Sequence, residues 1–166
     1  MDLTYKEQIE RCRVLETKSL DLSWEKIHTF PKEILHLPNL EELNLSNNKI
    51  ASIPRDIFRL KSLKKLNLGR NKIRELPQEL RGLLNLEELI LSNNGLTEIP
   101  ASIKHLYNLK KLDISFNQIT KLPNELKFLN HLEILLLNNN SINELIEEVA
   151  TLDNLYHLEI ADNPIN

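Results

Sequence analysis

One pattern recurs along the chain at a spacing of 23 residues. Four of its copies read LEELNLSNNKI from Leu40, LKKLNLGRNKI from Leu63, LEELILSNNGL from Leu86 and LKKLDISFNQI from Leu109. A fixed period in this range is typical of a solenoid, in which each unit buries its apolar residues against its neighbours. The pattern therefore predicts a stack of repeats around one continuous core.

The 166 residues divide into a short N-terminal segment and a series of these units. We expect residues 1–16 to form an N-terminal cap helix and residues 17–166 to form the repeats. The six full repeats begin at Thr17, Leu40, Leu63, Leu86, Leu109 and Leu132, and a partial seventh begins at Leu155. Positions are counted from the first residue of each repeat.

Two apolar columns predict a short strand in every repeat. Residues two apart on a strand point to the same face, so positions 4 and 6 face the core and positions 3, 5 and 7 face outward. Position 4 holds Leu20, Leu43, Leu66, Leu89, Leu112, Leu135 and Leu158, and position 6 holds Leu22, Leu45, Leu68, Leu91, Ile114, Leu137 and Ile160. Stacked in parallel, these strands would form one long concave sheet.

A polar column and a proline column follow each strand. Position 9 holds Asn48, Asn71, Asn94, Asn117, Asn140 and Asn163, and position 15 holds Pro31, Pro54, Pro77, Pro100 and Pro123. Asparagine both donates and accepts, so we expect a buried ladder that satisfies backbone groups where the chain leaves the sheet. Proline suits the start of a helical turn, so a short helix or 3₁₀ turn should follow it on the convex side. The sixth repeat departs from this rule with Ile146.

The two ends of the chain differ. Residues 4–15 place Tyr5, Ile9, Cys12 and Leu15 on one helical face, and Thr4 begins a capping-box pattern, so this helix should cover the first core layer. The chain stops at NPIN without a comparable cap. We therefore expect a longer protein, or a partner at this end, and the chain to be a monomer or a weak homodimer through it.

Composition narrows the classes of partner. Lysine and arginine number 21 against 24 acidic residues, a balance that favours neither nucleic acid nor a membrane surface. The sequence has neither a run of 18 apolar residues nor a secretory signal in its first residues. Cys12 is the only cysteine, which excludes an internal disulfide and favours a reducing, cytoplasmic location.

With these columns in phase, the chain resembles the leucine-rich repeat proteins from Thr17 to its end. The pattern LPxxLxxLxxLxxLxLxxNxL is most similar to the intracellular class shared by bacterial repeat proteins, Ras-suppressor-like and Scribble-like scaffolds, and the repeat domains of Roco GTPases. A helix leading into KSLDLSWEKI is similar to how the bacterial and Roco versions begin. The resemblance implies an α/β fold, a right-handed solenoid with a concave parallel β-sheet, and protein binding without catalysis.

The outward columns carry alternating charges. Position 2 holds Glu41, Lys64, Glu87, Lys110 and Glu133, and position 3 holds Ser19, Glu42, Lys65, Glu88, Lys111, Ile134 and His157. Because neighbouring strands lie about 4.8 Å apart, each glutamate should lie beside a lysine of the next repeat. Two interpretations stay open. The rows form a self-neutralising ladder, or they set the register of a bound partner.

A candidate binding site combines apolar and charged outward residues. An apolar patch towards the C-terminal half, with a polar rim, is typical of an interaction site. The predicted protein-binding residues of the concave face are Lys65, Arg70, Glu88, Ile90, Lys111, Asp113, Phe116, Ile134, Leu136 and His157. The alternatives are that the Phe116 ring lies flat on its neighbours and that Trp24 packs against the cap helix.

Catalytic and ligand-binding interpretations find little support in the sequence. His36 and His105 share a column but lie three repeats apart, about 15 Å by strand spacing. His157 and Glu159 are the best acid–base pair, yet the nearest concave serine, Ser115, is two repeats away. We therefore expect no enzyme, no catalytic residues, no cofactor and no metal.

The sequence thus predicts a non-enzymatic protein–protein interaction module that binds a protein partner on its concave face. Two alternatives remain. The chain is a regulatory or sensing fragment of a larger multidomain enzyme such as a Roco-like GTPase, or it self-associates through its uncapped C-terminal end.

Overall fold

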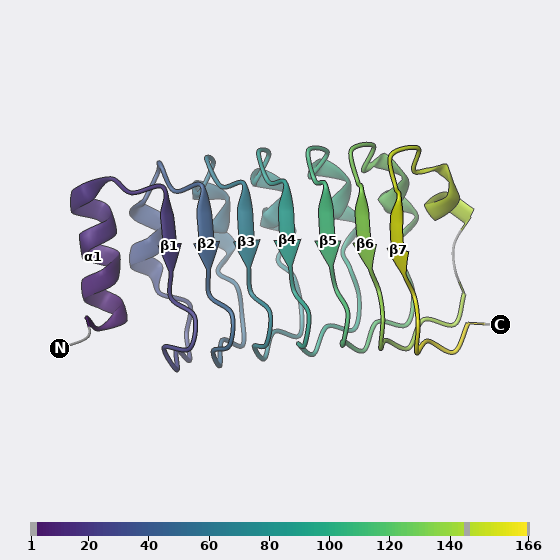
Figure 1. The fold of residues 1–166 in the computed structure, drawn as a ribbon, viewed down its shortest axis with the longest axis horizontal. Coiled ribbons are helices and arrows are strands. Elements are labelled where there is room, and N and C mark those ends of the chain that lie inside the picture. The colour runs from purple at the N-terminus through teal and green to yellow at the C-terminus, as the bar shows by residue number, and fades with distance from the viewer. Residues whose placement is uncertain (1–2, 145–146, 166) are drawn as a thin grey trace.

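The computed structural model describes residues 3–144 and 147–165. In this part of the chain, one helix precedes seven short strands that alternate with 3₁₀ helices (Figure 1). The helix is α1 (Tyr5–Leu15), and the strands are β1 (Ser19–Asp21), β2 (Glu42–Asn44), β3 (Lys65–Asn67), β4 (Glu88–Ile90), β5 (Lys111–Asp113), β6 (Ile134–Leu136) and β7 (His157–Glu159). The 3₁₀ helices are η1 (Lys32–His36), η2 (Arg55–Arg59), η3 (Gln78–Gly82), η4 (Ala101–His105), η5 (Asn124–Phe128) and η6 (Glu147–Thr151).

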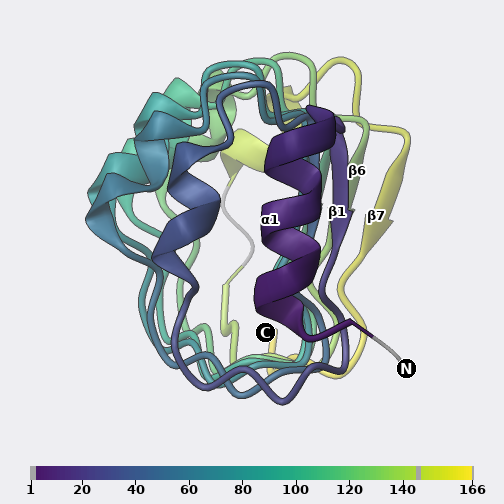
Figure 2. The same ribbon diagram turned by 90° about the vertical axis from the view of Figure 1, so that its left-hand side faces the viewer.

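The strands form one parallel sheet in chain order, β1 to β7. Every pair is in register by one whole repeat, so that Leu43 pairs with Leu66 and Leu66 pairs with Leu89. The 3₁₀ helices lie on the opposite side of the stack from the strands (Figures 1 and 2). Like residues of successive repeats therefore lie beside one another, which is the stack predicted from the period. The α/β solenoid implied by the family resemblance is confirmed.

The core is the continuous stripe that the apolar columns predict. Leu89 and Leu91, at positions 4 and 6 of the fourth repeat, are both fully buried. Position 7 was placed wrongly among the outward positions, because Ser46 and Ser115 are buried there. The chain has already begun to turn inward at this point, so strict strand alternation ends at position 6.

Five of the 3₁₀ helices begin directly after the proline column. Pro54, for example, has φ −67° and ψ 146° and stands as the residue before η2 rather than as its first residue. Its fixed φ leads the chain from extended backbone into the turn. The predicted departure at Ile146 lies outside the described residues.

Helix α1 covers the first core layer, as Figure 2 shows. The predicted capping box is present, because the Thr4 hydroxyl accepts from the N–H of Glu7 and the Glu7 carboxylate accepts from the N–H of Thr4. Ile9 and Cys12 are the buried residues of this helix. Leu15 was wrongly assigned to this face; it is 58% exposed, because the helix ends there and the chain turns through Glu16 at a φ of 49°.

The first and last repeats differ from the middle ones. Glu25 stands where later repeats have the ladder asparagine, and it accepts a 2.7 Å hydrogen bond from Gln8 of the cap helix. At the other end, Leu158 of β7 is 37% exposed, whereas Leu135 at the same position of β6 is fully buried. Within the described residues, no helix has the length and apolar character needed to cross a membrane.

Candidate interaction surface

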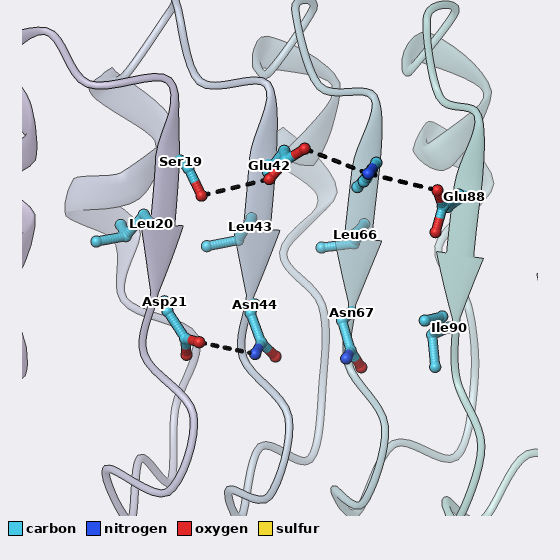
Figure 3. Close-up of a pocket in the computed structure, with 11 residues that line it drawn as sticks. Ser19, Leu20, Asp21, Glu42, Leu43, Asn44, Leu66, Asn67, Glu88 and Ile90 are labelled. Carbon is cyan, nitrogen blue, oxygen red and sulfur yellow. Dashed lines mark hydrogen bonds and ion pairs between the residues drawn. The ribbon is translucent and has the colours of Figure 1, made fainter.

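The outward face of the first four strands carries a row of paired charges. Lys65 lies between two carboxylates, with its Nζ 3.4 Å from Glu42 Oε1 and 3.6 Å from Glu88 Oε1. Figure 3 shows Ser19, Glu42 and Glu88 in one row above Asp21, Asn44, Asn67 and Ile90. These residues line a shallow hollow of about 300 Å³ on the concave face. These charges are adjacent because the strands are in register: Lys65 is paired with Glu42 on one side and with Glu88 on the other.

A second row of charges lies at position 2. Glu41 accepts from two lysines, at 2.6 Å from Lys18 Nζ and 2.7 Å from Lys64 Nζ, and Glu87 lies 2.8 Å from Lys110 Nζ. The hydrogen bonds from Lys18 and Lys64 lower the pKa of Glu41 to about 2. The predicted charge ladder is therefore present over the first repeats, with Lys18 as an additional member. Pairs of this kind are partly exposed and stabilise the fold only weakly.

The low pKa of Glu41 gives a direct test of this ladder. We expect its carboxyl group to titrate near pH 2, well below the usual 4.5, in an NMR titration of the side-chain carboxyl carbon. The stability that the pairing adds should be complete above the usual pKa and lost as the pH falls through the lowered one. Lys64→Gln should raise the pKa by removing one partner, whereas Lys65→Gln should leave it unchanged. A wild-type midpoint near 4.5 would contradict the pairing.

The apolar outward residues fall into two separate groups. Ile90 of β4 and Leu136 of β6 are both half-buried, and Asp113 of β5 pairs in register between them. Ile134 is also half-buried and lies beside Leu136 on β6, while Ile90 lines the hollow of the first four strands. The structure therefore does not join these three side chains into one continuous patch.

At position 5, a polar side chain makes a local hydrogen bond that an apolar side chain cannot make. Asp21, Asn44, Asn67 and Asp113 each accept a hydrogen bond from the backbone N–H two residues later, at 2.8 to 3.1 Å. This local bond stabilises the turn that follows each strand. Ile90 and Leu136 have no side-chain oxygen and cannot make it. Their repeats therefore present apolar surface where a polar residue would stabilise the turn.

Polar groups flank the apolar residues of β6. The Asp113 carboxylate accepts from the hydroxyl of the buried Ser115 at 2.6 Å. His157 Nε2 lies 2.9 Å from Glu159 Oε1, and the other oxygen of Glu159 accepts from the Asn138 amide. Lys111 pairs in register with Ile134 and has no acidic partner among the described residues. Within the same residues, no group of three or more potential metal ligands is gathered.

Arg70 and Phe116 do not lie on strands. Both occupy position 8, where the backbone has a positive φ in every repeat. The residues of this column, here named the strand-end rim, are Trp24, Asn47, Arg70, Asn93, Phe116, Asn139 and Asp162, with φ between 54° and 64°. Sequence reasoning missed this conformation, although the asparagines and aspartate in the column, which adopt it most readily, are a signal for it.

The aromatic residues of the strand-end rim are exposed. Trp24 is 72% exposed, so the expectation that it packs against the cap helix is wrong. Phe116 is 50% exposed and keeps half of its surface available. A hollow of about 420 Å³ lies along the rim, lined by Trp24, Asn47, Asn48, Arg70, Asn71 and Asn93.

Two ladders of polar side chains connect neighbouring repeats, one just after the strands and one just before them. The predicted asparagine ladder at position 9 is present, and each amide bonds backbone in its own repeat and in the preceding one. It is buried only in part, because Asn71, Asn94 and Asn163 are half-buried. A second ladder at the last position of the repeats was not predicted. Its members, which bond a carbonyl oxygen of the preceding repeat, are Asn85, Asn108, His131 and Asn154.

Family models support this architecture over the middle of the chain. The model described as leucine rich repeat matches residues 38–96, and the model described as leucine rich repeats (2 copies) matches residues 84–131. No curated protein sequence matches the chain significantly.

Solved structures share the fold over nearly the whole chain. A leucine-rich repeat protein of Leptospira interrogans is 41% identical with a TM-score of 0.91, and the match covers 95% of this chain and 40% of that one. An internalin of Listeria monocytogenes is 30% identical with a TM-score of 0.84, over 95% of this chain and 45% of that one. The plant peptide hormone receptor RGFR1, solved in complex with RGF2, is 32% identical with a TM-score of 0.80, over 93% and 26%. The chain thus spans less than half of these proteins.

A parallel sheet in register by one repeat, two polar ladders and short convex turns define a solenoid repeat protein. Its repeats carry leucine and asparagine at fixed positions of a 23-residue unit, and the two leucine-rich repeat models together match residues 38–131. The chain belongs to the leucine-rich repeat proteins. Domains of this family generally mediate protein–protein interaction and are generally not enzymes.

Proposed function

We propose that the chain is a non-enzymatic interaction module that holds a protein partner on the outward face of β4 to β7. The observation that carries the proposal is the pair Ile90 and Leu136, which replace the turn-stabilising polar residue of position 5. Half-buried apolar side chains on an otherwise polar face are favourable anchors for a partner, because covering them removes apolar surface from water.

Charged groups around these anchors would give the site its selectivity. Lys111 and Asp113 of β5 lie between the two anchors, and His157 of β7 pairs in register with Ile134. By contrast, Lys65 and Glu88 already neutralise each other in the ladder. We therefore propose that Lys111, Asp113 and His157 contact the partner, and that Lys65 and Glu88 contribute mainly to register. Arg70 and Phe116 belong to the neighbouring strand-end rim.

The family and the fold support this proposal. The plant receptor is described in complex with RGF2, and its structure matches the present repeats over 93% of the chain. A solenoid backbone is rigid through its stacked repeats, so binding loses little entropy in ordering the surface. The cytoplasmic location and the regulatory-fragment alternative stay predictions.

The double variant Ile90→Asp, Leu136→Asp tests the proposed site. We expect a partner captured from source lysate by the wild-type chain to bind the variant at least about tenfold more weakly, because two buried carboxylates would oppose the contact. Both side chains are only half-buried in the free chain and face outward, so the variant should fold. Circular dichroism checks the fold, and Asn67→Asp on the same column, which keeps the acceptor for the N–H of Gly69, provides the charge control. Equal binding by the double variant would move the site off β4 to β7.

Self-association is a second candidate, favoured by the exposure of Leu158 and Tyr156 at the last strand. Light scattering over a wide concentration range decides it. A constant monomer mass would remove this alternative, and a mass that rises with concentration and is reversed by Leu158→Glu would support it.

A further inference from the structure

The strand-end rim has chemistry of its own in the first three repeats. Trp24 and Arg70 stand two repeats apart, with Asn47 between them and Asn93 beyond, around the hollow described above. Position 10, two residues further along the same turns, holds exposed Lys26, Lys49 and Lys72. The later repeats have Gly95, Gln118 and Ser141 at that position.

The cations of this rim are not used within the fold. Lys26, Lys49, Arg70 and Lys72 have no acidic partner among the described residues, whereas Lys64, Lys65 and Lys110 each hold one or two carboxylates. Two acids of the same repeat, Asp21 and Glu25, accept hydrogen bonds from neutral groups, so they form no ion pair there and keep their charge. The Asp21 carboxylate accepts from Ser23 and Asn44, and the Glu25 carboxylate accepts from Gln8. In a chain of net charge −3, four exposed cations at positions 8 and 10 of the first three repeats therefore have no ion-pair partner within the described residues.

The spacing along the rim selects the form of the ligand. Large side chains alternate with asparagine, so Trp24, Arg70 and Phe116 recur every second repeat, about 10 Å apart by strand spacing. An extended peptide in the polyproline II conformation rises about 9.3 Å over three residues and returns its side chain to the same face. Between the large side chains, Asn47 and Asn93 offer amide groups that both donate to and accept from a peptide backbone.

We propose that the strand-end rim binds an extended segment of a partner protein that runs across the strands. In this segment a central acidic side chain pairs with Arg70 and the flanking lysines. Apolar side chains three residues before and after it pack on Trp24 and Phe116. The site is separate from the anchors on β4 and β6 and goes beyond the function proposed for them.

Charge and shape favour an acidic peptide over a nucleic acid. Single-stranded nucleic acids are bound through successive aromatic platforms and an extended positive groove. Here the two aromatic residues of the rim, Trp24 and Phe116, stand four repeats apart and are not successive, and the unpaired cations Lys26, Lys49, Arg70 and Lys72 belong to the first three repeats. The amide-lined hollow instead suits a peptide backbone.

Trp24 is the only tryptophan in the chain, so its fluorescence reports on the rim directly. The probe is a seven-residue peptide with leucine at both ends, glutamate at its centre, and alanine or serine elsewhere. We expect saturable changes in Trp24 emission. The peptide with lysine at its centre should bind about fivefold more weakly, the upper end of what the loss of one exposed ion pair costs.

Matched variants separate the rim from other surfaces. Arg70→Asn introduces the residue that already occupies this position in the adjacent repeats, so the fold is kept and the peptide affinity should fall about fivefold. Lys104→Gln, on exposed convex η4, should leave the affinity unchanged. The proposal is overturned by unchanged emission at millimolar peptide, by equal binding of both peptides, by an unaffected Arg70→Asn variant, or by a response to oligouridine RNA alone.

Discussion

Replacing Asn117 with alanine is expected to lower the free energy of unfolding by about 1–3 kcal/mol. The side chain is 9% exposed, and its amide donates to the carbonyl oxygens of Leu91, Ile114 and Ser115 at 3.0 to 3.1 Å. Its own oxygen accepts from the N–H of Leu96 at 3.0 Å. Truncation would leave the buried N–H of Leu96 without an acceptor. It would also remove the hydrogen bonds that connect Asn117 to the preceding repeat.

Urea unfolding followed by circular dichroism measures this loss. The control is Gln118→Ala, because Gln118 is the next residue, is exposed and has no side-chain hydrogen bond within the described residues. Asn117→Asp is a second informative variant. It keeps the acceptor for Leu96 but loses the amide donors and buries a charge, so it should also be destabilised. If Asn117→Ala were no less stable than Gln118→Ala, the ladder would not be a source of stability.

The repeated columns explain why so much of the fold is predictable from the sequence. Leu43, Leu66 and Leu89 pair in register because each has the same task in its repeat, and the task requires the same residue every time. The ladder asparagines repeat for the same reason, since the backbone groups that they satisfy recur in every turn. Where the local structure requires the same residue type in every repeat, that requirement is visible in a single sequence as a column of identical residues.

The strand-end rim shows the opposite case. Its backbone has a positive φ throughout, yet the column mixes Trp24, Arg70 and Phe116 with asparagine. Because side chains at this position extend from an exposed turn, the fold accepts different residues at a modest energetic cost. The conformation was therefore hidden by the variety of residues, and Trp24 was wrongly expected to pack against the cap helix.

The candidate site was predictable only in part. Register alone places Glu42, Lys65 and Glu88 side by side, so the ion pairs could be anticipated from the repeat. Whether Ile90 reaches Leu136 depends instead on the size and direction of the side chain between them, Asp113. Its carboxylate turns to Ser115, and the two apolar groups stay separate. The residues that bind a partner remain a prediction, because contacts with a partner do not require the same residue in every repeat and so form no column in the sequence.

Leu89→Ala is expected to destabilise the chain by about 2–5 kcal/mol, through lost transfer free energy and the cavity that the truncation leaves. Leu89 is fully buried and pairs in register with Leu66 on one side and Leu112 on the other. In a stack whose stability is a sum of repeats and of interfaces between neighbours, a central position weakens two interfaces at once. The effect should therefore spread along the stack and not remain in the fourth repeat.

Leu84→Ala provides the matched control, because Leu84 is 44% exposed and lies five residues earlier in the chain. The same atoms are removed in both variants, so the difference in unfolding free energy measures burial alone. Hydrogen exchange should show faster opening of both β3 and β5 in Leu89→Ala, since each loses a neighbour. Equal stability of the two variants, or faster exchange confined to β4, would contradict a core that is continuous along the stack.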